Sequence, residues 1–378
     1  MRVALLVSVA AAAVVATSAS GAPNLQLGIT DSGNAYFGNP QTFYAQLGQL
    51  HAKLLRVHLN WGGRLGVARR RPEYGFDPDD PAYDWRRYDA IVLNADAYGV
   101  QVVFSIFGSP RWANGDRLPT RAPFHARDLQ DFASAAAERY SGSYMRDDGV
   151  VLPAVRRWTA WNEPNLPIGL VPQWKRVHGR WVIQSAIDYA RICNAIVDGI
   201  QGTLIRGEQV ACGDTAPRGN NAPASTRPTT SPLAFLRAMK RAGARGFDAY
   251  AHHPYAGNPD EAPTTKPPSR TAVEFGNLGD LITVVTRLYG HKPIWVDEYG
   301  YQTNPPDSFL GVTPALQARY LTESVAMARA NPRVTMLLWF LLSDEPRRGG
   351  WQSGLETASG KRKPAFFAFA RAARGARG

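Results

Sequence analysis

The sequence predicts a single α/β domain folded as a (β/α)8 (TIM) barrel. Apolar runs of strand length alternate with amphipathic stretches of helix length along nearly the whole chain, and they form eight pairs. Alternation of this kind indicates a parallel sheet, and eight repeats indicate a closed barrel. The length of 378 residues fits one barrel with inserted loops.

The elements can be assigned in order from these patterns. The expected strands are 25–30, 54–59, 100–107, 157–162, 209–213, 247–253, 293–298 and 334–341. The expected helices are 41–51, 84–98, 126–140, 184–201, 232–242, 271–289, 313–330 and 365–373. The longest connections follow the second, fourth, fifth and sixth strands, which places them on the face where barrel enzymes bind substrate. We interpret 216–231 and 257–269, rich in Pro, Thr and Asn, as cleft walls and not as domain linkers.

The amino-terminal segment has the pattern of a secretory signal peptide. Arg2 precedes an apolar stretch from Val3 to Ala16, and small residues follow up to Ala22. The apolar stretch is shorter than the roughly 20 residues of a membrane-spanning helix. We therefore predict a signal peptide at 1–22, with cleavage near residues 19–22, and a barrel domain at 23–378. The expected location is secreted or cell-wall associated, without membrane insertion after cleavage.

Two cysteines occur, Cys193 in a predicted helix and Cys212 in a predicted strand. In an exported protein they can form a disulfide, and two buried free thiols are an equal alternative. No metal-binding spacing such as Cys-x-x-Cys is present, so no metal or other cofactor is expected.

The formal net charge is +12. Such an excess can indicate an acidic partner, for example an anionic cell-wall glycan, or it can reflect codon composition. The basic residues are scattered, and the dense clusters at 69–71 and 371–377 lack the aromatic spacing of a nucleic-acid-binding module. This distribution favours the compositional explanation, and no nucleic-acid partner is expected.

Two glutamates stand at the ends of predicted strands. Trp161-Asn162-Glu163-Pro164 closes the fourth strand, and Asp297-Glu298 closes the seventh. Side chains that follow different strands of one barrel meet at its carboxyl-terminal mouth. A retaining glycosidase needs two carboxyl groups about 5 to 5.5 Å apart, one protonated to assist the leaving group and one ionised to attack the anomeric carbon. The pair therefore predicts an enzyme that cleaves glycosidic bonds.

These motifs resemble those of glycoside hydrolase clan A, and the resemblance extends from Gly28 to about Ala373. It implies that Glu163 is the general acid/base and Glu298 the nucleophile. Asp297 is a competing nucleophile, but adjacent strand residues point to opposite faces, so we expect only one of the two to enter the barrel. The resemblance selects Glu298.

The resemblance also implies roles for residues on other strands. Asn162 would donate to the hydroxyl next to the anomeric carbon, and Arg56 would lie beside Glu298 and keep it ionised. His252-His253-Pro254-Tyr255 resembles a His-x-Tyr element of several clan families, so His253 and Tyr255 are candidates for the site, with Tyr255 donating to Glu298. His252 is expected to have a core or hydrogen-bonding role.

Three tryptophans are candidates for contact with sugar rings. Trp339 matches the clan's platform under the sugar unit that is cleaved, although core packing is an alternative. Trp112 and Trp61 can wall the cleft or pack the loops.

The family within the clan stays open. Ser109-Pro110-Arg111-Trp112 and the compact ending look like family thirty-nine, and the His-x-Tyr element looks like family five. We expect a secreted, monomeric, retaining glycoside hydrolase whose partner is a poly- or oligosaccharide. The alternatives are a non-catalytic carbohydrate-binding barrel at the cell surface and a polyanion-binding surface protein.

Overall fold

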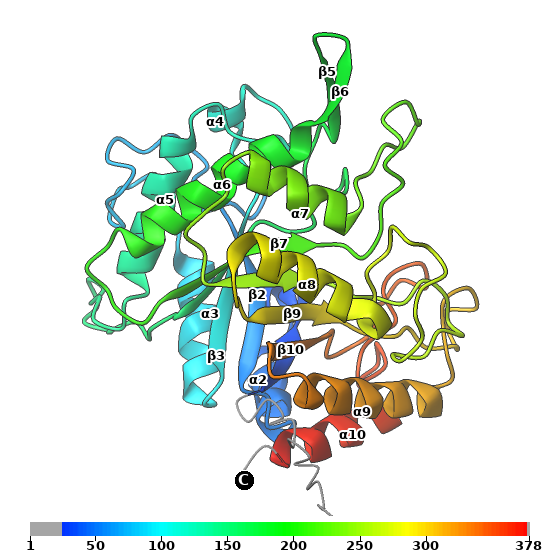
Figure 1. Ribbon diagram of the computed structural model, residues 1–378. Helices are drawn as coiled ribbons and strands as arrows, with labels where there is room; N and C mark the ends of the chain where they lie inside the picture. Colours follow the sequence, from blue (N-terminus) through cyan, green and yellow to red (C-terminus); the bar gives the residue numbers. More distant parts are fainter. Residues whose placement is uncertain (1–24, 376–378) are drawn as a thin grey trace, which may run out of the picture.

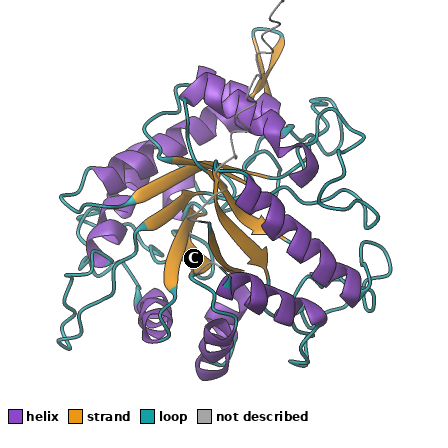
Figure 2. Ribbon diagram, turned by 60° about the horizontal axis from the view of Figure 1, so that its bottom comes forward, coloured by secondary structure: helices purple, strands orange, loops and turns teal. Residues whose placement is uncertain are grey.

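The computed structural model describes residues 25–375 and shows a closed barrel of eight parallel strands inside a ring of helices (Figures 1 and 2). The strands are β1 Gln26–Thr30, β2 Leu54–Asn60, β3 Gln101–Phe107, β4 Arg157–Ala160, β7 Gln209–Thr215, β8 Ala249–His252, β9 Ile294–Tyr299 and β10 Val334–Phe340. Their order around the barrel follows the chain, and β1 closes the barrel against β10. The predicted (β/α)8 fold is confirmed. The predicted signal peptide lies outside the described residues.

A helix follows each strand. These helices are α2 Pro40–Gln49, α3 Arg86–Ala97, α5 Ala126–Arg139, α6 Gln184–Gln201, α7 Pro232–Arg241, α8 Leu278–Tyr289, α9 Pro314–Ala330 and α10 Pro364–Arg374. The helix predicted at 271–289 begins later than expected, because Glu274 and Asn277 form a capping box around the short 3-10 helix η1 Phe275–Asn277. No helix of residues 25–375 is long and apolar enough to span a membrane.

Three additional elements were not predicted. Two are short helices, α1 Ser32–Phe37 and α4 Arg111–Asn114. The third is a hairpin of β5 Trp174–Val177 and β6 Arg180–Ile183, which projects from the barrel beyond α6 and α7 (Figure 1).

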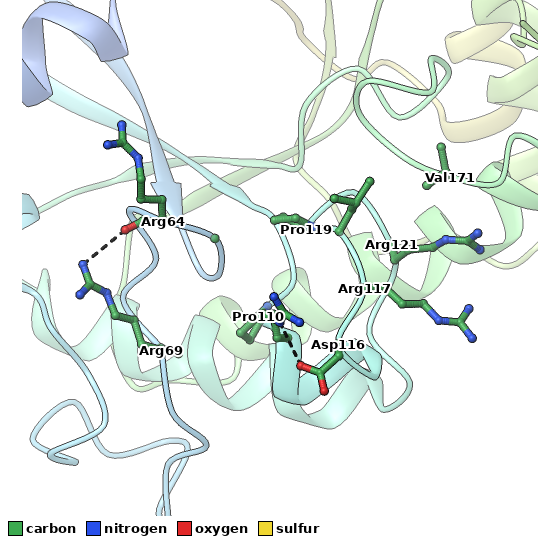
Figure 3. A pocket seen from close by; sticks show the side chains of 12 residues that line it. Arg64, Arg69, Pro110, Asp116, Arg117, Pro119, Arg121 and Val171 are labelled. Carbon is green, nitrogen blue, oxygen red and sulfur yellow. Dashed lines mark hydrogen bonds and ion pairs between the residues drawn. The ribbon is translucent and has the colours of Figure 1, made fainter.

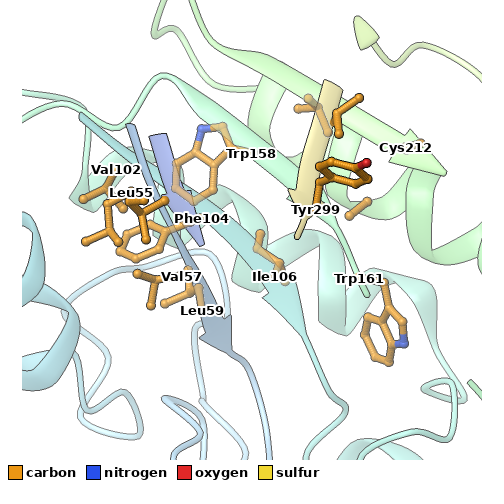
Figure 4. Packing of buried hydrophobic residues seen from close by; sticks show 14 of the residues in the cluster. Leu55, Val57, Leu59, Val102, Phe104, Ile106, Trp158, Trp161, Cys212 and Tyr299 are labelled. Atoms are coloured by element: carbon orange, nitrogen blue, oxygen red, sulfur yellow. The ribbon is translucent and has the colours of Figure 1, made fainter. Parts of the chain in front are cut away.

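Alternation along the strands divides the buried side chains into two groups. Leu55, Val57 and Leu59 of β2 pack in the large cluster that includes side chains of the surrounding helices (Figure 4). The alternate residues fill the barrel interior in a second cluster, made of Leu54, Val103, Ala211, Ala249, Ala251, Trp295, Met336 and Leu338. Because Arg56 lies two residues after Leu54, it also points into the barrel, one layer closer to the mouth.

Cys193 and Cys212 form a disulfide. Their Cα atoms are 6.0 Å apart, and both side chains are fully buried. The bond ties the middle of α6 to the outer face of β7, so of the two alternatives left open by the sequence, the pairing is the one that the structure shows.

We expect the Cys193→Ala/Cys212→Ala variant to lose about 3 kcal/mol of unfolding free energy in urea titrations, because the bond closes a short loop in the unfolded chain. The control is wild-type protein that has been unfolded, reduced and refolded. It lacks the disulfide bond but keeps both cysteine side chains, so it separates loss of the bond from loss of packing. Equal stability of the reduced and oxidised proteins would contradict the prediction.

Candidate active site

Glu163 and Glu298 meet at the carboxyl-terminal mouth of the barrel. Glu163 lies in the loop after β4, and Glu298 is near the end of β9. One carboxylate oxygen of each and one ring nitrogen of His253 all lie within 4.8 Å of one another. The side chains of Glu163 and Glu298 are 17% and 11% exposed, so both reach solvent. This short separation suits a pair of carboxyl groups that act on one bond by a retaining mechanism.

Arg56 is completely buried beneath this pair. Its guanidinium lies 3.0 Å from Asp214 Oδ2 and 2.9 Å from Asp297 Oδ2. It also lies 3.2 Å from Glu298 Oε2. An arginine enclosed in a barrel is tolerated only with carboxylate partners, and here it has three. Arg56 therefore holds one carboxyl group from β7 and two from β9 around a single cation.

His253 supplies a second cation next to the first. Its Nδ1 lies 3.0 Å from Glu163 Oε1, and its Nε2 lies 2.8 Å from Asp214 Oδ1. Burial acts to lower the pKa of His253, but the charges of Glu298 and Asp297 outweigh burial and hold this pKa well above its usual value. A charged imidazolium thus connects the acid/base candidate to a buried aspartate.

The pKa values of the two buried aspartates are shifted in opposite directions. Burial raises the pKa of Asp214 to about 7, although the charge of Arg56 opposes the rise. Burial also acts on Asp297, but the charges of Arg56 and His253 outweigh it and lower the pKa of Asp297 to about 2. Asp297 is therefore the permanent carboxylate, and Asp214 is the group that exchanges a proton near neutral pH.

Tyr255 donates a hydrogen bond to Glu298 Oε1 over 2.9 Å, which is the contact expected for it. Burial raises the pKa of Glu298, and the charges of His253 and Arg56 together with the Tyr255 hydroxyl oppose that rise. Each of these groups stabilises the carboxylate form.

The turn that carries Glu163 has an unusual backbone. Trp161 has a φ of 73° and Glu163 a φ of 42°, which is the left-handed region that non-glycine residues rarely adopt. Tertiary contacts hold it: the Trp161 indole donates to the Gly169 carbonyl (2.8 Å), and the Glu163 amide donates to the Asp214 carbonyl (2.8 Å). The second contact fixes the backbone of Glu163 to the strand that supplies Asp214.

Irregular pairing turns two carboxyl groups into the barrel. The register of β9 with β10 steps from Val296↔Leu337 to Tyr299↔Trp339, so β9 has one extra residue there. Both Asp297 and Glu298 consequently reach Arg56, and the prediction that only one of them points inward is wrong. On β7 a similar shift, with a φ of 48° at Asp214, turns that side chain inward.

Asn162 and His58 complete the inner ring. Asn162 Oδ1 accepts a hydrogen bond from Arg56 (2.9 Å), which orients the amide and leaves its NH2 group as the donor. His58 follows Arg56 by two residues on β2 and stacks on Phe107. Burial, with the nearby charge of Arg56, lowers the pKa of His58 to about 3, so its ring is neutral.

Sequence reasoning did not find Asp214 or His58, and it assigned Asp297 only as a competitor of Glu298. Period-two alternation with Leu54 and Arg56 was a signal available for His58. Asp214 had no such signal, because its direction depends on the shift in β7.

Trp339 lies differently from the platform role that the resemblance implied. Trp339 is 2% exposed, and its Nε1 donates to the Ser353 carbonyl (2.8 Å), so it is a packed side chain and not a platform at the mouth. The physical reason is alternation, which places Trp339 with Leu337 on the helix-facing side of β10. Trp351, 42% exposed, instead stacks on Tyr255, with ring centroids 5.8 Å apart.

Trp112 and Trp61 pack loops together. The Trp112 indole donates to the Ala68 carbonyl (2.9 Å), and its ring meets the fully buried Trp61 edge to face. Of the two roles considered for them, the structure shows the packing role. His252 is a core residue, held between the Thr215 hydroxyl and the Val273 carbonyl.

Two sets of side chains have donor atoms close enough to surround a cation: Glu163, His253 and Glu298, and Asp214, His253 and Asp297. Both use His253, and their carboxylates already pair with Arg56, with His253 or with the Tyr255 hydroxyl. The arrangement is suited to proton transfer and charge stabilisation by these side chains.

The sequence matches no family model and no curated protein. Solved structures resemble it in fold. A glucosidase from Croceicoccus marinus shares 12% identity over 94% of this chain and 68% of that chain, with a TM-score of 0.68. A family 39 glycoside hydrolase from Bacteroides cellulosilyticus shares 16% over 94% and 64%, with a TM-score of 0.63. One from Xanthomonas axonopodis pv. citri shares 18% over 93% and 67%, with a TM-score of 0.55.

The chain shares its barrel fold with clan A glycoside hydrolases. It spans about two thirds of the length of these three proteins. At such low identity the similarity is one of fold, and the function has to be argued from the site.

Gly169 provides a test of the turn that carries Glu163. A Cβ atom at this position would lie 2.2 Å from the Asn162 carbonyl oxygen and 2.3 Å from that of Glu163. We expect Gly169→Ala to lower the unfolding free energy by about 1 to 3 kcal/mol, because the backbone must move. Gly279→Ala is the control: Gly279 is exposed in α8 and a Cβ there would meet nothing within 4 Å, so stability should stay equal or rise slightly in the same urea titrations. Equal effects of the two variants would contradict the role of Gly169.

Proposed function

We propose that the protein is a secreted retaining glycoside hydrolase that cleaves a glycosidic bond in a poly- or oligosaccharide. The observation that carries the proposal is the close approach of Glu163 and Glu298 at the barrel mouth. The shared fold with glycoside hydrolases and the predicted signal peptide support it.

In the first step the Glu298 carboxylate attacks the anomeric carbon as the bond to the leaving oxygen breaks, and protonated Glu163 gives its proton to that oxygen. Arg56 and Tyr255 contact the two oxygens of Glu298 and hold it in position for attack. Because Arg56 holds the Asn162 oxygen, the NH2 group is the part of this amide that would donate to the sugar.

In the second step water attacks the glycosyl ester, Glu163 accepts the proton of that water, and the carboxylate of Glu298 is released. His253 lies between the two glutamates, so its charge interacts with both carboxyl groups as their ionisation changes. Its contact with Asp214 keeps the ring oriented through both steps.

The two glutamates can be told apart with aryl glycosides. We expect Glu298→Ala to lose activity by at least about 10⁴-fold on every substrate, because no covalent intermediate forms. Glu163→Ala should keep fast formation of the intermediate with a dinitrophenyl leaving group, which needs no proton, and then stall. Burst kinetics measure both steps, and a 2-fluoro glycoside should label Glu298. Full turnover by Glu163→Ala, or labelling of another residue, would overturn the assignment.

Asp214→Asn tests the connection through His253. Loss of the Asp214 carboxylate removes a group that favours charged His253, so the variant's imidazolium should lose its proton at a lower pH. Because the pKa of Asp214 is about 7, this carboxyl group is protonated in the wild-type enzyme at pH 5.5 and is neutral, as the Asn side chain is in the variant. The two proteins should therefore have similar kcat/KM at that pH. As the pH rises above 7, kcat/KM of the variant should fall at a lower pH than kcat/KM of the wild-type enzyme. Superimposable pH profiles between pH 5 and 9 would contradict this connection.

A further inference from the structure

A basic pocket lies beside the barrel mouth, outside the site described above. Its volume is about 780 Å³, and its walls are the loops that follow β2 and β3, with Val171 from the loop after β4 (Figure 3). Gly63 and Pro110 of its lining are each three residues beyond the end of a strand, so they lie within about 11 Å of the mouth. The pocket therefore borders the place where a substrate of Glu163 and Glu298 would lie.

The lining of this pocket contains five arginines and only one carboxylate. Asp116 pairs with Arg111 at 2.9 Å, which leaves Arg64, Arg117 and Arg121 without a carboxylate partner among the described residues. Arg69 makes no direct ion pair there, but it is close enough to Asp84 for the two charges to interact. Arg64 lies on one side, and Arg117 and Arg121 extend together on the other (Figure 3). Arginines from the loops after β2 and β3 are thus gathered beside the mouth.

The basic surface continues into a second pocket of about 480 Å³. Arg117 and Arg121 line both pockets, and the second adds Lys175 and Arg191. Its single carboxylate, Asp188, pairs with Arg191, so Lys175 adds to the excess. Lys175 is exposed and is the second residue of β5 in the β5–β6 hairpin, whose Arg176 stacks on the exposed Trp181.

We propose that this strip, defined by Arg64, Arg69, Arg117, Arg121 and Lys175, binds the anionic groups of a glycan, carboxylate or sulfate, whose chain is cleaved at the barrel mouth. The inference rests on the proposed glycosidase function and names its substrate class. Arginine guanidinium groups match carboxylate and sulfate oxygens by paired hydrogen bonds. A glycan is favoured over a nucleic acid because the strip lies beside the barrel mouth that holds the carboxyl pair, and because it lacks a row of aromatic side chains for base stacking.

The strip is tested by binding to immobilised polymers, measured by biolayer interferometry with Glu298→Gln as the common background so that nothing is cleaved. The probes are polygalacturonate and its carboxyl-reduced form, dextran sulfate and dextran, and duplex DNA. We expect at least tenfold tighter binding to the anionic member of one glycan pair at 50 mM salt. The difference should vanish at 1 M salt, where the Debye length is about 3 Å.

Arg117→Gln/Arg121→Gln should weaken binding to the preferred anionic glycan about tenfold and leave binding to its neutral counterpart unchanged. The matched control is Arg241→Gln/Arg287→Gln, which removes the same charge from two exposed arginines at the carboxyl ends of α7 and α8, on the opposite side of the barrel. The control should bind like the parent protein.

Equal effects of the two double variants, equal affinity for charged and neutral glycans, or equally tight binding of DNA would each overturn the proposal. The catalytic function is measured separately, as hydrolysis of a small aryl glycoside by the protein with Glu298 intact. Glycan binding without hydrolysis would refute the glycosidase and keep the strip, whereas hydrolysis without charge preference would refute the strip alone.

Discussion

The guanidinium of Arg56, enclosed at the centre of the barrel, is the interaction on which the rest of the site depends. A buried charge is tolerated only when it is paired, and Arg56 pairs with carboxyl groups from two different strands. Those groups are buried as well and need Arg56 in return. His253 adds the second cation and extends the arrangement to Glu163. Because every member compensates another, Glu163 and Glu298 are positioned by one electrostatic unit and not by two separate loops.

The sequence predicts the scaffold well, and the site in part. Periodicity placed all eight strands, and alternation with Leu54 sends Arg56 inward, as the structure shows. Alternation fails where pairing is irregular: the extra residue in β9 brings Glu298 inward beside Asp297. Such a bulge depends on contacts between strands that no single strand encodes. Trp339 is the opposite case, because family resemblance suggested a platform while its own alternation with Leu337 placed it among the helices.

Backbone strain in the turn after β4 explains how Glu163 acquires a particular role here. Residues held in the left-handed region cost about 1 to 3 kcal/mol each, and the turn contains two of them, Trp161 and Glu163. The surrounding structure compensates through the buried Trp161 indole and the contact of Glu163 with the Asp214 carbonyl. The strained turn aims Glu163 across the mouth towards His253.

Charge is distributed unevenly over the catalytic face, and this constrains how an anionic glycan could lie on it. At the mouth, the carboxylates of Asp297 and Glu298 are balanced by the cations Arg56 and His253 when Glu163 and Asp214 hold their protons. A negative group placed there would find no unpaired cation and would lie against the Glu298 carboxylate, in a partly dehydrated site where like charges interact strongly. The loops beside the mouth have an excess of cations. A glycan bound across both would therefore place a neutral sugar unit over Glu298 and its charged units over Arg117 and Arg121.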